Sequence, residues 1–387
     1  EGETSFRTLL IPIGGRPESL GSAFTGLCDD VSYINYNPAG SCIQNETQIS
    51  VFHNSWISDS KMDTIAYTTR FRNLGIGTQF SCFYVPFTEY NSFGNRVNSS
   101  YYSETSLALN FAYNFKAGYK FKGIAVGASA KTSWRGMPNY TDDNSGFIIK
   151  NSGIQQSGLG VMVDVGALMQ FNFLKFFTSR EPNVRIGISA QNLGVALTGF
   201  TKKIGLDDPL PSYFAIGISC QFLPIIGITI DFKQPVNLLN WNNYLTPAFG
   251  FGIILDFIEN FNLLAGFELK GGNPRLSLGG EFQLTHVRLN FNYSLDFTSS
   301  FTPINRISMA AKIMLGDKGR KKTQTQIDEL FSQGLVYYYK AEWDLAIETW
   351  KQILKLNKNY DPALLGIKSA ETQKKLIDEV QNSMYFK

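Results

Sequence analysis

The segment Val287-Arg-Leu-Asn-Phe-Asn-Tyr-Ser-Leu-Asp-Phe297 places large apolar side chains at every second position, with polar side chains between them. An extended strand with this alternation has one apolar face and one polar face. The same alternation occurs upstream, in Phe261–Lys270 and Arg275–Leu284. In a soluble sandwich the apolar face packs inward, whereas in a transmembrane barrel it meets lipid and the polar face lines the lumen. The strands alone are compatible with both architectures.

Composition favours a membrane barrel. Charged residues make up 17% of the 387 residues and aromatic residues 14%, against a typical charged fraction of about 25%. No apolar run reaches the ~18 to 20 residues of a membrane-spanning helix, which excludes an α-helical membrane protein. The net charge of +3 does not point to nucleic acid. Glu1 opens a polar segment without signal-peptide features, and from the barrel interpretation we expect a signal peptide to have been removed.

The alternation predicts fourteen antiparallel strands of about ten residues, a length that suits a tilted strand crossing ~25 Å of apolar membrane. The predicted strands are Glu46–Ser55, Met62–Arg72, Gly75–Val85, Glu104–Ala117, Lys122–Trp134, Gly158–Phe173, Asn183–Leu193, Ser212–Phe222, Ile225–Phe232, Tyr244–Asp256, Phe261–Lys270, Arg275–Leu284, His286–Phe297 and Asn305–Leu315.

The connections between these strands alternate mostly between long and tight, as in transmembrane barrels, whose external loops are long and periplasmic turns short. The long connections are Phe87–Ser103, Gly136–Ser157, Gly194–Pro211 and Lys233–Asn243, and the tight ones include Asn73–Leu74, Gly118–Phe121, Leu223–Pro224 and Phe257–Asn260. Leu174–Pro182 is longer than this rule predicts, and the last two external connections are short. We therefore expect a barrel in the bacterial outer membrane, with both chain termini in the periplasm.

The first 45 residues do not have the strand pattern. Leu20, Phe24 and Leu27 fall at helical spacing between Glu18 and Asp30, and a turn-rich piece ends at Asn37-Pro-Ala-Gly40. We expect a short helix followed by turns, placed before the first strand.

The run Gly14–Gly40 resembles the N-terminal hatch of the FadL-type outer-membrane long-chain fatty acid transporters. That family opens with a glycine-rich, small-residue helix, an acidic pair and an Asn-Pro-Ala-Gly turn, and all three are present here. The acidic pair is Asp29 and Asp30, and the turn is Asn37, Pro38, Ala39 and Gly40. The chain also resembles the spirochaetal FadL-like branch, in which a helical repeat follows the barrel. The resemblance implies a plugged barrel that admits hydrophobic molecules.

After Leu315 a charged linker leads into a helical period. The spacing of a tetratricopeptide repeat is met by Leu330, Gly334, Tyr337, Ala346, Trp350 and Leu356, although Gln333 and Lys358 depart from its pattern. A plain amphipathic helical hairpin is the alternative. The predicted domains are residues 1–45 as hatch or plug, 46–316 as transmembrane barrel, and 317–387 as linker and periplasmic tetratricopeptide-like domain.

A fatty acid carboxylate needs a basic group at the edge of an apolar pocket. Among the residues at lumen-facing positions, Lys131, Arg185 and Arg288 are the candidates for this role. Phe24, Leu27 and Tyr33 of the hatch are candidates for contact with an acyl chain, or they seal the wall. The family resemblance also implies sideways release through a kink in an early strand, for which Gly75, Gly77 and Pro86 are the candidates because glycine and proline weaken a strand ladder.

The sequence shows no enzyme, metal or cofactor motif. The two histidines, His53 and His286, lie at strand edges without a Cys or carboxylate cluster at metal-ligand spacing. The third hypothesis, after the two given below, is a lipid-modifying enzyme that pairs one of these histidines with a lumen serine. Cys28 and Cys42 are either a disulfide or two small buried thiols.

The leading prediction is an all-β transmembrane barrel that takes up long-chain fatty acids or other hydrophobic molecules by passive diffusion, without cofactor or catalysis. The alternative is a structural or partner-binding barrel that acts in secretion or assembly through its helical-repeat tail, with a periplasmic protein as partner. Neither prediction involves nucleic acid.

Overall fold

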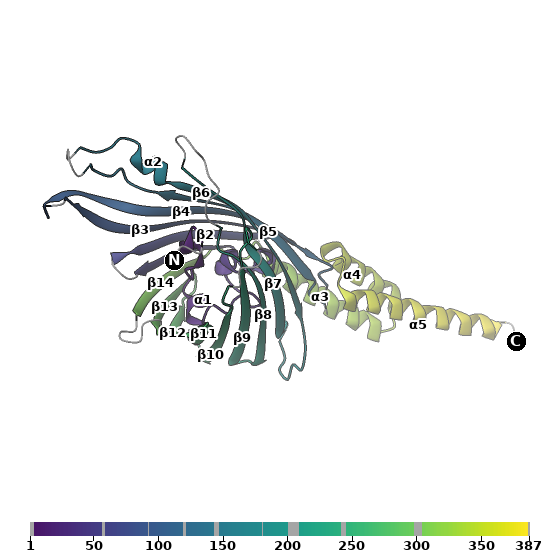
Figure 1. Cartoon of the computed structure of the whole chain (residues 1–387). Helices are drawn as coiled ribbons and strands as arrows, with labels where there is room; N and C mark the ends of the chain where they lie inside the picture. The colour runs from purple at the N-terminus through teal and green to yellow at the C-terminus, as the bar shows by residue number, and fades with distance from the viewer. Residues whose placement is uncertain are drawn as a thin grey trace. The chain divides into compact units, whose positions relative to one another are not determined.

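The computed structural model describes residues 4–55, 59–91, 93–118, 121–142, 147–179, 181–199, 209–240, 245–297 and 304–385. Within these ranges fourteen antiparallel strands form a closed barrel, in which each strand pairs with its neighbours in sequence and β1 pairs with β14 (Figure 1). The strands are β1 Gln48–Ser55, β2 Lys61–Phe71, β3 Leu74–Tyr90, β4 Arg96–Phe115, β5 Ile124–Gly136, β6 Gly158–Phe171, β7 Val184–Thr198, β8 Ser212–Leu223, β9 Ile226–Val236, β10 Ala248–Ile258, β11 Phe261–Lys270, β12 Asn273–Gln283, β13 Val287–Asp296 and β14 Ile304–Met314. The predicted number of strands and their antiparallel order are confirmed.

The apolar face of the wall points outward. In β13, Phe291 and Tyr293 are 44% and 40% exposed, whereas Asn290 and Asn292 are 1% and 3% exposed. Val51 on β1, at 48% exposure, follows the same rule. An inward polar face and an outward apolar face distinguish a membrane-type barrel from a sandwich, which buries its apolar face.

The alternation of long and tight connections is present, but several predicted loops are partly strand. The predicted loop Phe87–Ser103 is mostly a two-stranded ribbon, because β3 continues to Tyr90 and β4 begins at Arg96. Likewise, β7 continues to Thr198 and β9 to Val236. The polar composition of these stretches concealed their strand character. The connection between β5 and β6 holds the short helix α2 (Ser152–Gln156).

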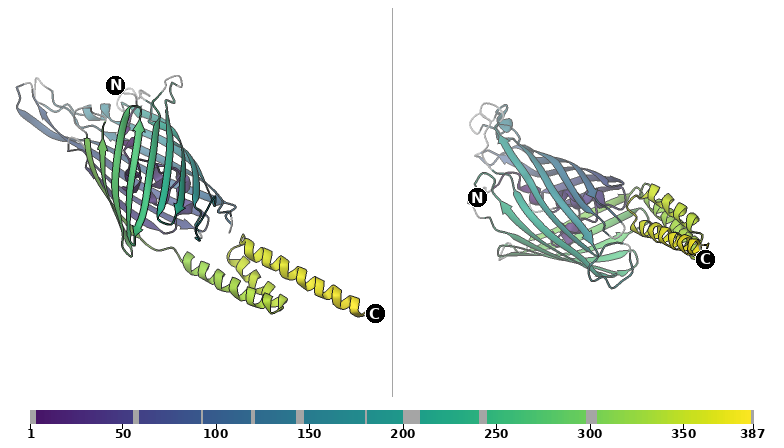
Figure 2. Two further views of the ribbon diagram at one scale, coloured as in Figure 1. Left: turned by 90° about the horizontal axis from the view of Figure 1, so that it is seen from below. Right: turned by 90° about the vertical axis from the view of Figure 1, so that its right-hand side faces the viewer.

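Residues 4–47, here called the inner segment, lie inside the barrel (Figure 2). The inner segment contains η1 (Arg7–Leu10), α1 (Arg16–Ser19), η2 (Val31–Asn35) and η3 (Pro38–Ile43). The expected helix between Glu18 and Asp30 is therefore wrong, because the α-helix there is the single turn α1, which ends at Ser19. Gly21, just after α1, has a positive φ of 61° and closely approaches the backbone of β11, which ends the helix there.

The inner segment runs from one end of the barrel to the other. The Ser5 amide donates to the Pro209 carbonyl (2.9 Å), in the connection between β7 and β8. At the opposite end, where the tight turns lie, Gln48 at the start of β1 pairs with Met314 at the end of β14. The first described residues therefore lie at the end that carries the long connections, and the placement of both termini in the periplasm stays a prediction. The alternation of the strands could not reveal the path of the inner segment, because the segment that crosses the lumen has no strand pattern.

Contacts group the chain into two units, one of residues 1–115 and 124–315 and the other of residues 116–123 and 316–387. The second unit contains α3 (Arg320–Tyr339), α4 (Trp343–Leu356) and α5 (Asp361–Tyr385). Trp350 of α4, at 1% exposure, packs against Gly334 of α3 and Gly366 of α5, where a Cβ atom would collide with its ring. Hydrogen bonds from the backbone N–H groups of Lys321 and Gly319 lower the pKa of the Asp317 carboxylate. The helices are present, and their assignment as a tetratricopeptide repeat stays a prediction.

Two further observations bear on the predicted architecture. Among the described residues, no helix combines the length and the apolar character needed to cross a bilayer. All four cysteines are free, and Cys28 and Cys42 are buried thiols rather than a disulfide.

Gly266 of β11 tests how closely the wall and the inner segment pack. A Cβ atom at this position would lie 2.1 Å from the Gly21 amide nitrogen, so that Gly266→Ala forces the backbone apart. We expect the free energy of unfolding to fall by about 1–3 kcal/mol. Gly227→Ala is the control, since its Cβ would make only ordinary contact at 3.5 Å with Ile254. Urea unfolding in detergent measures both variants, and equal stability of the two would contradict the close packing.

Candidate functional site

One side of the inner segment packs directly against glycines of the wall. Cβ atoms at Gly127 of β5, Gly166 of β6 and Gly187 of β7 would lie 2.5, 2.2 and 2.1 Å from atoms of Pro38, Asn37 and Thr25, respectively. Larger residues at these wall positions would push the segment away. The glycines therefore let the wall close tightly around the Asn-Pro-Ala-Gly turn.

The turn residues Asn37, Pro38, Ala39 and Gly40 are buried. The Asn37 side-chain amide donates to the carbonyls of Thr25 and Ala167, both at 3.0 Å, and its oxygen accepts from the Ala39 amide at 3.1 Å. The Pro38 carbonyl accepts a hydrogen bond from the Asn110 side chain at 2.9 Å. The turn thus ties the inner segment to β4 and β6.

Charged pairs attach the opposite side of the inner segment to β12 and β14. Arg16 bonds both Asp29 of its own segment and Glu281 of β12, each at 2.8 Å. Glu18 pairs with Arg306 at 2.5 Å and also accepts from Ser308. Asp30 pairs with Lys312. Because Glu18, Asp30 and Lys312 are no more than 1% exposed in their side chains, each charge depends on its partner for compensation.

The three basic residues predicted to hold a carboxylate already have protein partners. Lys131 pairs with Asp164 at 2.6 Å, and Arg185 donates to the Leu27 carbonyl at 2.7 Å. Arg288 donates to Gln283 at 3.1 Å and lies 3.6 Å from Glu281. None of the three lines the lumen cavity described below. Their predicted binding role stays a prediction, and the geometry gives them a structural one.

The three apolar residues predicted to meet an acyl chain lie in packed clusters. Phe24 and Leu27 pack with Leu20, Tyr36 and Leu264. Tyr33 is fully buried in a separate cluster, and its hydroxyl bonds Thr68 at 2.8 Å. None of the three borders the lumen cavity, and their role, contact with an acyl chain or sealing of the wall, stays a prediction.

The residues predicted for sideways release lie in continuous ladders. Gly75 pairs with Arg70 and Ala112, and Gly77 pairs with residues of the same two strands, β2 and β4. Pro86 lies past the partner of Lys61, the first residue of β2, and within the described residues its strand partner is Tyr101 of β4. Gly75 and Gly77 also make room for the inner segment, because Cβ atoms there would meet Ser41 and the Tyr33 hydroxyl. The lateral opening remains a prediction.

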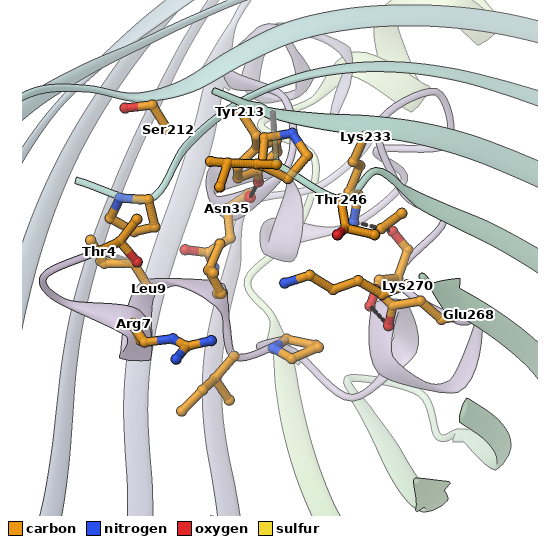
Figure 3. Close-up of a pocket in the computed structure, with 18 of the residues that line it drawn as sticks. Thr4, Arg7, Leu9, Asn35, Ser212, Tyr213, Lys233, Thr246, Glu268 and Lys270 are labelled. Atoms are coloured by element: carbon orange, nitrogen blue, oxygen red, sulfur yellow. Dashed lines mark hydrogen bonds between the residues drawn. The ribbon is translucent and has the colours of Figure 1, made fainter. Parts of the chain in front are cut away.

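A cavity of about 340 Å³, here called the chamber, lies between the start of the inner segment and strands β8 to β12 (Figure 3). It is at the end of the barrel that carries the long connections. Its lining residues are Thr4, Arg7, Leu9, Leu10, Ile11, Pro12, Ser22, Asn35, Tyr36, Pro211, Ser212, Tyr213, Lys233, Pro235, Leu245, Thr246, Ala248, Glu268, Lys270 and Arg275. Aliphatic, proline and tyrosine side chains thus share the lining with charged ones.

The charge of the chamber is predominantly positive, with four basic side chains and one carboxylate in its lining. Lys233 donates to the Ser22 carbonyl at 2.7 Å and lies 4.9 Å from the Tyr36 ring centroid. Arg275 pairs with Glu268 and donates to the Ser22 hydroxyl at 3.0 Å. Figure 3 shows Arg7 and Lys270 extending toward one another across the cavity. Two cations that face each other favour an anion between them.

Sequence reasoning missed the chamber. Lys233, Lys270 and Arg275 lie near the external ends of β9, β11 and β12, at the end of the barrel that carries the long connections. The alternation of the sequence showed that these side chains point inward. It did not show how far along the barrel axis each residue lies. The position of a basic residue at the external end of a predicted strand is the signal that could have found them.

A larger depression, of about 900 Å³, lies on the outer face of the wall over β4 to β9. Its rim consists of outward apolar side chains such as Phe111, Phe214 and Phe232, each more than 40% exposed. It carries no charged side chain among its lining residues. This depression belongs to the bilayer-facing surface and not to the lumen.

Lys312→Met tests the charged attachment of the inner segment. It leaves the buried Asp30 carboxylate uncompensated, a loss that typically costs about 3–5 kcal/mol. In a Cys82→Ser/Cys220→Ser background the remaining thiols, Cys28 and Cys42, lie in the inner segment and are 0% exposed. We expect Lys312→Met to speed their labelling by a maleimide on the order of a hundredfold, because such labelling requires the segment to open.

Lys374→Met is the control, because it removes a pair with Asp344 in which both side chains are exposed. Such pairs contribute about 0–1 kcal/mol. Equal labelling rates in the two variants would show that the buried pair does not hold the segment.

Comparisons with known proteins agree with this architecture. Two proteins of Treponema pallidum (strain Nichols), each described as "UPF0164 protein", are 26% and 27% identical to this chain. The alignments cover 98% and 94% of this chain and 85% and 74% of the relatives. Among solved structures, the toluene transporter TodX of Pseudomonas putida superposes with a TM-score of 0.52 at 11% identity, over 78% of this chain and 98% of TodX.

The likeness to TodX supports the fold, a closed antiparallel β-barrel. Membership of the FadL-type family is not shown by it and stays a prediction. A family model, in contrast, matches residues 1–318, which include the whole barrel and its inner segment. The chain therefore belongs to the family described as "Uncharacterised protein family (UPF0164)".

Proposed function

We propose that this protein takes up long-chain fatty acids or other hydrophobic molecules across the bacterial outer membrane by passive diffusion. The long connections face outward and the tight turns face the periplasm in this proposal. The observation that carries it is the chamber, a cavity inside the barrel whose lining combines apolar side chains with basic groups.

The chamber suits an amphiphile. Leu9, Ile11 and Leu245 offer apolar surface to a hydrocarbon chain. Arg7 and Lys270 reach into the same cavity and can form charge-assisted hydrogen bonds with a carboxylate. Pockets that combine apolar walls with a few polar groups are typical of small-molecule sites.

In this proposal the inner segment acts as the hatch. A molecule is captured at the outer connections, enters the chamber and leaves when the inner segment moves. Residues 4–12 border the chamber, whereas Arg16, Glu18 and Asp30 are held by the ion pairs to β12 and β14. Movement of the first part alone leaves these buried pairs intact and is therefore the less costly step.

Uptake into liposomes tests the proposal. Vesicles that contain the purified protein should take up a labelled fatty acid faster than vesicles that contain an unrelated barrel. Arg7→Gln/Lys270→Gln should slow this uptake about tenfold, since loss of charge-assisted bonds weakens capture. Uptake of a neutral hydrocarbon should stay unchanged in the same variant.

Arg96→Gln/Lys150→Gln is the matched control, because it removes two exposed basic residues near the long connections but outside the chamber. Uptake no faster than with the unrelated barrel would overturn the proposed function. If both double variants slowed uptake equally, the chamber would not be the binding site for the fatty acid.

The second candidate is a partner-binding barrel, and the helical unit favours it. Packed helix pairs of this kind present surfaces for peptides or proteins. Several aliphatic side chains of α5, including Leu365, Leu376 and Val380, are about half exposed. A periplasmic protein that recognises these helices is the partner in this alternative.

Deletion of residues 318–387 separates the two candidates. Because the chamber and all fourteen strands precede residue 318, fatty acid uptake should persist in the truncated protein under the first proposal. Under the second proposal, recovery of a periplasmic partner by the purified barrel should be lost. The measurement is the uptake rate together with affinity capture from periplasmic extract. Loss of uptake with an intact barrel would contradict the first proposal.

A further inference from the structure

Three side chains on the outer face of the wall form a hydrogen-bonded chain. His53 Nδ1 lies 2.7 Å from Asp63 Oδ1, and His53 Nε2 lies 3.2 Å from Ser55 Oγ. With Nδ1 protonated, His53 donates to the carboxylate and accepts from the serine hydroxyl. This is the order of contacts in a Ser-His-Asp triad, which is recognised by geometry and roles rather than by sequence position.

The strand register produces this arrangement. His53 and Asp63 are direct partners across β1 and β2, so that their side chains leave the sheet side by side. Ser55 follows His53 by two residues and therefore lies on the same face of β1. The Tyr84 hydroxyl of β3 also hydrogen-bonds the Asp63 carboxylate.

The three residues lie at a polar–apolar boundary. Ser55 ends β1 at the end of the barrel with the long connections, and the side chains of His53 and Asp63 are 46% and 49% exposed. The flanking outward residues are apolar: Ile65 on β2 is 56% exposed, and Ile307 and Met309 on β14 are 61% and 49% exposed. An acyl chain of a bilayer lipid can lie along these residues while its ester reaches Ser55.

A positive charge is available beside the serine. Lys61 is the direct partner of Ser55 in the β1–β2 register and shares the outward face. An ammonium group near the reacting carbonyl can stabilise the oxyanion that forms in acyl transfer. The nucleophile, base, orienting carboxylate and a cation therefore gather within two neighbouring strands.

We propose that Ser55, His53 and Asp63 form an acyl-ester hydrolysis site for membrane lipids. This activity is separate from uptake through the lumen. Its substrate class is the carboxylic ester of a glycerophospholipid with long acyl chains, and its second reactant is water.

In the first half of the reaction, Ser55 Oγ forms a bond to the ester carbonyl carbon while its proton moves to His53 Nε2. The carbonyl electron pair shifts to oxygen. When this intermediate collapses, the bond from the carbonyl carbon to the alcohol oxygen breaks. The proton on His53 goes to that oxygen, which leaves as the lysolipid.

In the second half, water adds to the acyl–Ser55 carbonyl and gives a proton to His53. Collapse breaks the bond to Ser55 Oγ, which takes the proton back. The products are a fatty acid and a lysolipid, and no electrons are exchanged with a redox partner. Asp63 holds the imidazole in the required tautomer and stabilises its charged form.

The full-length protein in phospholipid vesicles tests this site with a fluorophosphonate probe and with a phospholipid that carries a fluorescent acyl chain. We expect covalent labelling of Ser55, located by peptide mass spectrometry, and release of the labelled fatty acid. Ser55→Ala should abolish labelling, and both Ser55→Ala and His53→Gln should reduce hydrolysis at least about a thousandfold. Asp63→Asn should also slow hydrolysis while leaving Ser55 in place.

Two variants outside the site serve as controls. His286→Gln replaces the other exposed histidine, and Ser99→Ala replaces another exposed serine near the long connections. Both should hydrolyse the lipid at the unmodified rate. Because Ser55 is exposed, Ser55→Ala should fold, which the thermal unfolding midpoint checks. Hydrolysis no faster than in protein-free vesicles, or hydrolysis that survives Ser55→Ala, would overturn the proposal.

Discussion

A wall surrounded by hydrocarbon must pair every backbone N–H and C=O group within itself, since lipid offers no hydrogen-bonding partner. The seam between β1 and β14, with pairs from Gln48–Met314 to Ser55–Ile307, completes this pairing and leaves the sheet without an edge. Closure also fixes the direction of every side chain. Along most of the wall apolar residues face outward and polar residues face the lumen. The interior must therefore be filled by something that satisfies polar groups.

The inner segment fills the lumen, and its backbone groups are hydrogen-bond partners for the polar side chains of the wall. Its irregular chain has amide and carbonyl groups that no helix satisfies, and wall side chains complete them. Asp231 accepts from the amides of Phe24 and Thr25, at 2.9 and 2.8 Å, and Asn110 donates to Pro38. The lumen therefore contains two kinds of charge. Paired charges such as Lys312 attach the segment, while the excess of positive charge is concentrated in the chamber.

The strands, their order and the outward apolar face could be predicted because a period of two is a local property of the chain. The partners that an inward side chain meets across the lumen, in contrast, come from distant parts of the chain. Lys131 and Lys233 have the same inward parity, yet one is paired with Asp164 and the other borders the chamber. The bond between His53 and Asp63 likewise depends on the β1–β2 register, and no spacing in the sequence revealed Ser55 as the third member. The inner segment's path was misjudged because glycine contacts with the wall replace helical periodicity.

The position of the inner segment also constrains how this barrel is made. Residues 4–47 precede β1 and are synthesised before it, but Arg306 and Lys312, which pair with Glu18 and Asp30, are on β14. The segment cannot gain these partners until the last strand arrives. The attachment of the inner segment is therefore completed only after the whole wall has been synthesised, although the segment itself is made before any strand.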